Sequence, residues 1–325
     1  MEFVRRPRFK HVPDIAPIHL TGRDRDIIRQ VCRHRFLRSS HIIGLIGGST
    51  QQTLRRLQLL YHHGYLDRSR AQIDYFHRGG SQHMVYGIGN KGAAFRRGEF
   101  DFAFQDLDWT QKNRGVGRLF LEHALLASDV MVSLEIACRR NGRVRLLSGE
   151  ELPLPDTSRR RNELFQWNVK LNGETRLGLI PDCVFALEFL DQPAERNRVF
   201  YFLEADRGTM RITRRTLKQS SFHRKLVAYE ATWRQKLHQT RFGFARFRVL
   251  AVTTSASRTR HLVDTASRLE SGHGLFLFTH VDAFWAHPDP LSLPWDTAKG
   301  RKQESLLGSL VVHTPSCHNA ESMKE

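Results

Sequence analysis

Residues 177–208 read LGLIPDCVFALEFL (177–190), DQPAERNR (191–198) and VFYFLEADRG (199–208). Two apolar runs, each long enough for a strand, are joined by a short polar loop. Both runs stay apolar at consecutive positions, which indicates strands that are buried on both faces in the middle of a sheet. Because the loop is short, we expect the second strand to return beside the first. This stretch therefore predicts the centre of a sheet that is covered on each side.

Three carboxylates stand at the ends of these two expected strands. Asp182 follows Pro181 in the first run, and Glu204 and Asp206 close the second. Side chains alternate along a strand, so Glu204 and Asp206 share a face, and we expect all three acids to converge. Buried carboxylates are costly without a cation. The cation is either a divalent metal, since Mg²⁺ takes carboxylate oxygens, or a nearby arginine, such as Arg176, Arg198 or Arg207.

Length and composition set the class of protein. The chain has 325 residues, of which 26% are charged and 40% hydrophobic, so it can form two globular domains. It has no apolar run of about 18 residues, so we expect no membrane span. The four cysteines are scattered and none forms a CxxC pair, which favours free thiols in the reducing cytoplasm over disulfides or a zinc site.

The charge of the chain points to a polyanionic partner. The formal net charge is +18 and the isoelectric point is near 10.5. Residues 1–100 hold 18 Lys and Arg against 7 Asp and Glu, so they contribute +11 of this excess. Such a balance favours phosphate backbones first and anionic membranes second.

The first hundred residues predict a compact succession of elements. We expect helices at 23–34, 41–46 and 50–63, strands at 65–68 and 84–88, and a further helix that opens at Asn90. Ser49 and Gln52 form a capping box for the third helix. That helix should bury Leu54, Leu57 and Tyr61. Its exposed side chains near the start should be Gln51, Gln52, Arg55 and Arg56.

This order resembles a winged helix-turn-helix over residues 20–100. The resemblance implies that the third helix enters the major groove of double-stranded DNA, where Gln51, Gln52, Arg55 and Arg56 meet base edges. It also implies that the wing touches phosphate through Arg68 and Arg78. A basic helical bundle that binds a protein, or a winged helix used for dimerisation, remain as alternatives.

The rest of the chain predicts a second domain over residues 116–285, after a polar linker at 101–114. We expect helices at 116–140, 221–238 and 258–269, and strands at 144–147, 165–171, 247–254 and 275–279. Asn172-Gly173 is a favoured hairpin turn. Residues 286–325 are first Pro-rich and then polar, so we expect a disordered tail.

This α/β (α+β) order resembles the PD-(D/E)XK nuclease superfamily with its mixed sheet. Pro181-Asp182 corresponds to the PD motif and Glu204-Ala205-Asp206 to (D/E)-x-K, with Asp206 in place of the lysine. The resemblance implies a metal site for Mg²⁺ or Mn²⁺ at Asp182, Glu204 and Asp206. Lys225 and Tyr229, which lie four apart on one helix face, are where a substitute lysine could come from. These five residues form the candidate catalytic set of a metal-dependent endonuclease.

Four segments together resemble the replication-relaxation family of bacterial plasmids and integrative elements. They are LEHALLASDVMVSLE (121–135), IPD (180–182), FLEADRGT (202–209) and KLVAYE (225–230), and the resemblance covers about residues 20–280. It implies a DNA-binding protein that acts in replication, DNA relaxation or mobilisation.

Two hypotheses remain for the function. The first is a DNA-binding protein of a plasmid or mobile element with metal-dependent nicking activity. The second is a non-catalytic regulator or initiation factor whose second domain mediates assembly, which the Asp206 substitution favours. Double-stranded DNA is the expected partner in both. Replication or mobilisation proteins and a homodimer are left open as further partners.

Overall fold

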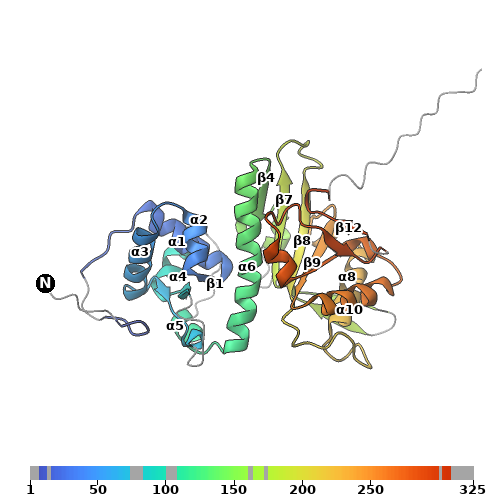
Figure 1. Cartoon of the computed structure of the whole chain (residues 1–325), viewed down its shortest axis with the longest axis horizontal. Helices are drawn as coiled ribbons and strands as arrows, with labels where there is room; N and C mark the ends of the chain where they lie inside the picture. The colour runs from blue at the N-terminus through green and yellow to red at the C-terminus, as the bar shows by residue number, and fades with distance from the viewer. Residues whose placement is uncertain are drawn as a thin grey trace, which may run out of the picture.

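The computed structural model describes residues 7–12, 16–73, 83–99, 108–159, 164–171, 175–299 and 302–308. Figure 1 shows a helical N-terminal part and a larger part built on a sheet, with the long helix α6 (Arg118–Asn141) standing between them. We call these the N-terminal part, up to residue 114, and the sheet part, from residue 144 onward. The architecture is mixed α/β, as the sequence predicts.

The N-terminal part contains the helices and strands that the sequence predicts, and in addition the strand β1 and the helix α5, which lies in the expected linker. Its elements are α1 (Gly22–His34), β1 (Phe36–Arg38), α2 (Ser39–Ile46), α3 (Thr50–His62), β2 (Leu66–Asp67), β3 (Val85–Ile88), α4 (Asn90–Glu99) and α5 (Trp109–Arg114). The unpredicted strand β1 pairs antiparallel with β3, which also pairs antiparallel with β2. The three helices α1, α2 and α3 enclose a common core around Ile28, Ile42 and Leu57.

Helix α3 buries one narrow stripe and leaves the rest of its surface exposed. The buried side chains are Thr53, Leu57, Leu60, Tyr61 and His62. Leu54 is 43% exposed, so its predicted place in the core is wrong. The physical reason is the helical period: the core stripe runs through Thr53, Leu57, Leu60 and Tyr61, and Leu54 lies beside it.

Helix α6 has apolar stripes on two opposite sides. Leu121 and Leu125 pack with Phe36 and Val85 of the N-terminal part, and Val132 joins the N-terminal core. On the other side, Val130, Met131, Leu134 and Cys138 belong to a core beneath the large sheet. The helix is therefore a shared wall of both parts (Figure 1).

Charged contacts reinforce this wall. Glu135 of α6 lies between Arg33 and His34 of α1, at 3.6 and 3.9 Å, and also accepts a hydrogen bond from Arg139. Burial raises the pKa of Glu135, but the contact with His34 and the charges of Arg33 and Arg139 outweigh it and lower the pKa to about 2. Asp129, further along α6, pairs with Arg38 and with His41 at 2.7 Å.

The sheet part is built on seven strands in the order β12-β11-β10-β9-β8-β7-β4. Their bounds are β4 (Val144–Ser148), β7 (Cys183–Phe189), β8 (Arg198–Ala205), β9 (Phe247–Thr253), β10 (Phe276–His280), β11 (Trp295–Thr297) and β12 (Gln303–Glu304). The central strands β8, β9 and β10 are parallel, and the other pairs are antiparallel. The prediction that the stretch 177–208 forms adjacent strands within the sheet is confirmed for β7 and β8, whereas residues 177–179 belong to β6 (Arg176–Leu179) of a separate two-stranded sheet.

Helices cover both faces of this sheet, which explains why consecutive residues of β7 and β8 are mostly apolar. One face packs on α8 (Phe222–Arg234), α9 (Leu237–Phe242) and α10 (Ala256–Ser267), together with the hairpin β5 (Trp167–Lys170) and β6 (Arg176–Leu179). The other face packs on α6 and α11 (Val281–Ala286). The short α7 (Asp156–Arg159) follows β4. The predicted turn Asn172-Gly173 lies outside the described residues.

The expectation of a disordered tail from residue 286 differs from the structure. Strands β11 and β12 extend the sheet beyond β10, and Leu291, Leu293, Trp295 and Leu306 are buried in its core. The prolines Pro288, Pro290 and Pro294 interrupt this segment, and because proline is depleted in strands, the sequence does not show one here. Residues 309–325 lie outside the described part of the chain. In that part, no helix is long and apolar enough to cross a membrane.

Candidate nucleic-acid interface and carboxylate cluster

The start of α3 carries polar side chains that the fold leaves available. Ser49 caps the helix, as predicted, because its side chain accepts a hydrogen bond from the backbone N–H of Gln52, but the Gln52 side chain does not return a bond, so only half of the predicted capping box forms. Gln51, Gln52 and Arg55 are exposed, as predicted. Their side chains make no hydrogen bond or ion pair among the described residues. This surface can therefore meet a ligand without first breaking an internal contact.

Arg56 differs from its predicted exposed position. Its guanidinium binds the Asp24 carboxylate of α1 through Nε and Nη2, at 2.8 and 2.5 Å, and Asp24 is fully buried. Burial raises the pKa of Asp24, but the bonds from Arg56 and Thr21 outweigh it and lower the pKa. Two charges that a helix period cannot reveal, 32 positions apart, thus hold α3 against α1.

A second arginine, Arg23 of α1, contacts the turn before α3. Arg23 donates to Thr53 Oγ1 at 3.0 Å and to the carbonyl oxygen of Gly47. Gly47 and Gly48 both have a φ of +71°, a conformation that favours glycine and that lets the chain reverse between α2 and α3. The position of α3 is therefore fixed by side chains that do not belong to its exposed surface.

The predicted phosphate contacts of the wing are not placed as expected. Arg68 is only 8% exposed, and its guanidinium lies over the ring of Tyr61 at 4.1 Å. It also donates to Tyr86 Oη at 3.0 Å and to the carbonyl oxygen of Arg8 at 2.8 Å. Stacking on two tyrosines draws this arginine inward from the short strand β2. Arg78 lies outside the described residues.

In the sheet part, the buried carboxylate of Glu204 contacts Lys225 and Tyr229, the two helix residues that the sequence places near it. Glu204 is 1% exposed at the end of β8. Lys225 of α8 forms an ion pair with its Oε2, and Tyr229 donates to its Oε1 at 2.6 Å. Burial raises the pKa of Glu204 to about 7, and the nearby charge of Asp182 adds to this, against the lowering by Lys225 and Tyr229.

Asp182 lies beside Glu204 but has its own partners. Its Oδ2 accepts the backbone N–H of Ala205 at 2.7 Å, and its Oδ1 lies 3.0 Å from His123 Nε2 of α6. The hydrogen bond with Asp182 raises the pKa of His123. The sequence analysis does not assign His123. Its place in the segment LEHALLASDVMVSLE was the available signal, but the contact spans 59 positions.

Asp206 turns to a different partner. Its Oδ2 accepts from Thr253 Oγ1 at 2.6 Å and from Arg258 Nε, and its Oδ1 accepts from Arg258 Nη2 at 3.0 Å. The alternative of an arginine partner is therefore realised for Asp206, but by Arg258 of α10, which the sequence does not single out. Arg198 and Arg207 pair instead with Glu188 and Glu122.

The three acids do not fit a divalent cation in this arrangement. Each of their carboxylates already has protein hydrogen bonds or ion pairs at both oxygens. Across the described ranges, no group of three or more His, Cys, Asp and Glu side chains could hold a metal ion. Of the two cations that the sequence leaves open, a divalent metal or a protein side chain, the structure shows the second for two of the acids: Lys225 beside Glu204 and Arg258 beside Asp206.

Comparison with known proteins identifies the family of the chain. Neither curated proteins nor solved structures gave a match. A family model described as replication-relaxation matches residues 28–246, from within α1 to the residue before β9. The matched segment thus holds both the exposed start of α3 and most of the carboxylate cluster. The chain belongs to the replication-relaxation family.

Proposed function

We propose that the protein binds double-stranded DNA through its N-terminal part, which acts as a winged helix-turn-helix with α3 in the major groove. The observation that carries this proposal is the exposed, unpartnered set Gln51, Gln52 and Arg55 on a helix that Arg23 and Arg56 hold in place. Amide and guanidinium groups are the side chains that pair with adenine and guanine edges. A helix fixed before binding loses little conformational freedom on the DNA.

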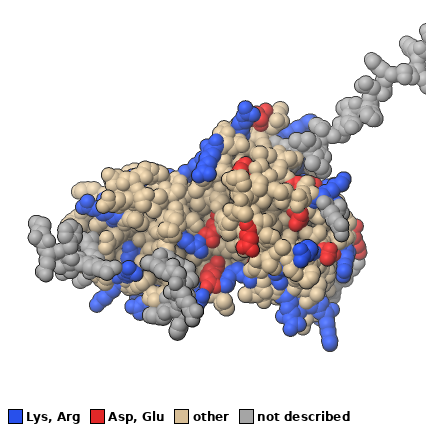
Figure 2. Space-filling model, viewed as in Figure 1, with Lys and Arg blue, Asp and Glu red and all other residues tan. Residues whose placement is uncertain are grey.

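The charge distribution supports the same partner. Residues 1–100 carry +11 of the net charge of +18. In Figure 2, the acidic side chains of the face shown lie mainly at α6 and over the sheet part. Two acids of the N-terminal part, Asp24 and Asp67, are buried and do not repel a phosphate backbone directly. DNA binding should therefore depend strongly on salt through counterion release.

The sheet part serves, in this proposal, as a non-catalytic body that carries the DNA-binding helix. Glu204 is paired with Lys225 and Asp206 with Arg258, and both oxygens of Asp182 contact groups of the protein. Membership in the replication-relaxation family supports a role in replication or relaxation of a plasmid or other mobile element. A nuclease-like ancestry of this part is compatible with that role.

The test is a binding titration by fluorescence anisotropy with duplex DNA. Arg55→Ala should weaken binding to a specific site by about 1–3 kcal/mol, the contribution of one good base contact. Arg260→Ala, which removes an exposed arginine of α10, is the matched control and should change binding by no more than about 0.5 kcal/mol. Equal losses in the two variants would remove α3 from the reading role.

Nicking activity distinguishes the two hypotheses for the sheet part. Supercoiled plasmid incubated with the protein and Mg²⁺ or Mn²⁺ should stay supercoiled, since both oxygens of each carboxylate are engaged by groups of the protein. Nicking that disappears in Asp182→Ala would show the opposite and would establish a metal-dependent endonuclease.

A further inference from the structure

A hollow of about 720 Å³ lies at the opposite end of β8 from the carboxylate cluster. Val199, at the start of β8, and Phe247, at the start of β9, form its floor, whereas Glu204 stands near the end of β8. The walls come from the end of α8, from α9 and from the loop before β10. We call it the α8–α9 hollow. Its volume is within the usual range of ligand pockets.

The lining of the α8–α9 hollow is cationic. It includes Arg234, Lys236, Arg246, Arg248 and Lys299, and no Asp or Glu is among the described residues that line it. Arg234, Arg248 and Lys299 face acids outside the lining. Lys236 makes no side-chain hydrogen bond or ion pair within the described chain, and Arg246 donates to the carbonyl oxygen of Arg196 at 3.1 Å. Positive charge is therefore available for an anionic ligand.

The backbone at Lys236 adds a second observation. Lys236 has a φ of +54°, in the left-handed region that a side chain other than glycine rarely adopts. Such a conformation is found preferentially at ligand-binding positions. It places the break between α8 and α9 at the rim of the hollow.

Aromatic and polar groups complete the site. Trp233 is 42% exposed at the end of α8 and lines the hollow beside Arg234. His238 is only 3% exposed, and its Nδ1 has no hydrogen-bond partner among the described residues. Cations around an exposed aromatic ring are the combination that binds single-stranded nucleic acid, because bases stack on the ring while phosphates meet the charges.

We propose that the α8–α9 hollow binds single-stranded DNA, with a base stacked on Trp233 and the backbone phosphates held by Lys236 and Arg246. A duplex keeps its base faces within the stack and cannot offer one to Trp233, so this site is distinct from the duplex-binding surface of α3. One chain would then hold duplex and single-stranded DNA at once.

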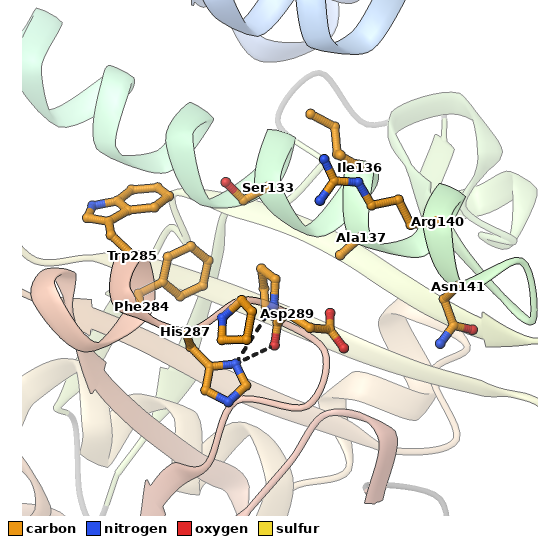
Figure 3. A pocket seen from close by; sticks show the side chains of 11 residues that line it. Ser133, Ile136, Ala137, Arg140, Asn141, Phe284, Trp285, His287 and Asp289 are labelled. Carbon is orange, nitrogen blue, oxygen red and sulfur yellow. Dashed lines mark hydrogen bonds between the residues drawn. The ribbon is translucent and has the colours of Figure 1, made fainter.

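The test uses the full chain and a fluorescent oligothymidine of about 12 nucleotides, within the usual site sizes of single-strand binding folds. Trp233→Ala should weaken binding roughly 5- to 150-fold, which corresponds to the stacking of one base. Trp285→Ala is the matched control, because Trp285 is similarly exposed, at 48%, but borders another hollow, between α6 and α11 (Figure 3). That variant should bind as the unmodified protein does.

Two further arms separate this site from α3. Unlabelled duplex DNA at saturation should leave oligothymidine bound, and the Arg55→Ala variant should keep its affinity for oligothymidine. Competition by duplex, or equal affinities for the Trp233 and Trp285 variants, would overturn the proposal while leaving duplex binding by α3 intact. Tighter binding of a matched oligouridine would overturn the assignment to DNA. Thermal melts confirm that both tryptophan variants are folded.

Discussion

At the start of α3, polar side chains are exposed and have no internal partner, whereas at the ends of β7 and β8 every carboxylate is held by the protein. Gln51 and Arg55 represent the first situation, and Glu204 and Asp206 the second. The sequence predicts a ligand site in both regions, DNA contacts at the polar start of α3 and a cation beside the acids at the strand ends. The difference teaches that such groups indicate a binding site only when the fold leaves their hydrogen-bonding atoms available.

The largest expected effect on stability separates two neighbouring arginines of α3, Arg56, which is paired with a buried acid, and Arg55, which is exposed. Arg56→Ala leaves the fully buried Asp24 without its guanidinium, and loss of one partner of a buried pair costs about 3–5 kcal/mol. Arg55→Ala, one position earlier and exposed, should lower the free energy of unfolding by no more than about 0.5 kcal/mol. Urea unfolding of the two variants measures both. Similar losses would mean that Asp24 does not depend on Arg56.

The next effect concerns the pH dependence of stability at Glu204. Its pKa rises from 4.5 to about 7 in the folded protein. The folded state therefore holds this proton more tightly, so the contribution favours folding below pH 4.5 and is lost as the pH rises through 7. In the unmodified protein, this titration should lower the free energy of unfolding by about 3 kcal/mol between pH 5 and pH 8. In Glu204→Gln, which has no carboxyl group to titrate, that decrease should be absent when measured by urea unfolding. The same dependence of stability on pH in the variant and the unmodified protein would contradict a raised pKa at Glu204.

A smaller effect of opposite sign is expected where the two parts meet. The pKa of Glu135 falls from 4.5 to about 2 on folding. Its stabilising contribution is present above pH 4.5 and is lost as the pH falls towards 2, about 2 kcal/mol after solvent screening. Acid unfolding of Glu135→Gln should show a correspondingly shallower loss. The same acid sensitivity in both proteins would place the titration elsewhere.

The smallest expected effect tests the carboxylates as ligands. Mg²⁺ or Mn²⁺ should shift the melting temperature by no more than about 1 °C, because a cation that does not bind the folded state cannot stabilise it. A larger rise that disappears in Asp182→Ala would restore the three acids as a metal site and would erase the contrast with α3.

Much of the fold follows from local pattern, because its main elements carry their own signals. The apolar runs around Phe185 and Phe202 predicted the central strands, and the spacing of Leu57 and Tyr61 predicted part of the buried face of α3. Strand β1 was missed because three residues are too few for a period. Strands β11 and β12 were missed because they owe their structure to a sheet edge that other segments build.

The candidate sites were predictable only in part for a similar reason. Lys225 and Tyr229 lie one turn apart, so their common approach to Glu204 could be read from the helical spacing. The partners of Arg56, Arg68 and Asp206 come from distant segments. An arginine on an exposed-looking helix face and one that neutralises a buried acid have the same local sequence, and only tertiary structure separates them.

The two apolar stripes of α6 give its length a meaning of its own. Each residue of an α-helix turns the chain by one part in 3.6, so one residue inserted near the middle of α6 would rotate its two halves by about 100°. Leu121 and Leu125 would then lose register with Leu134 and Cys138, because α6 is continuous between them and contains no loop that could absorb the change. The number of residues in this helix is thus as constrained as their identity. A cut placed within it would remove packed residues from the cores of both the N-terminal part and the sheet part.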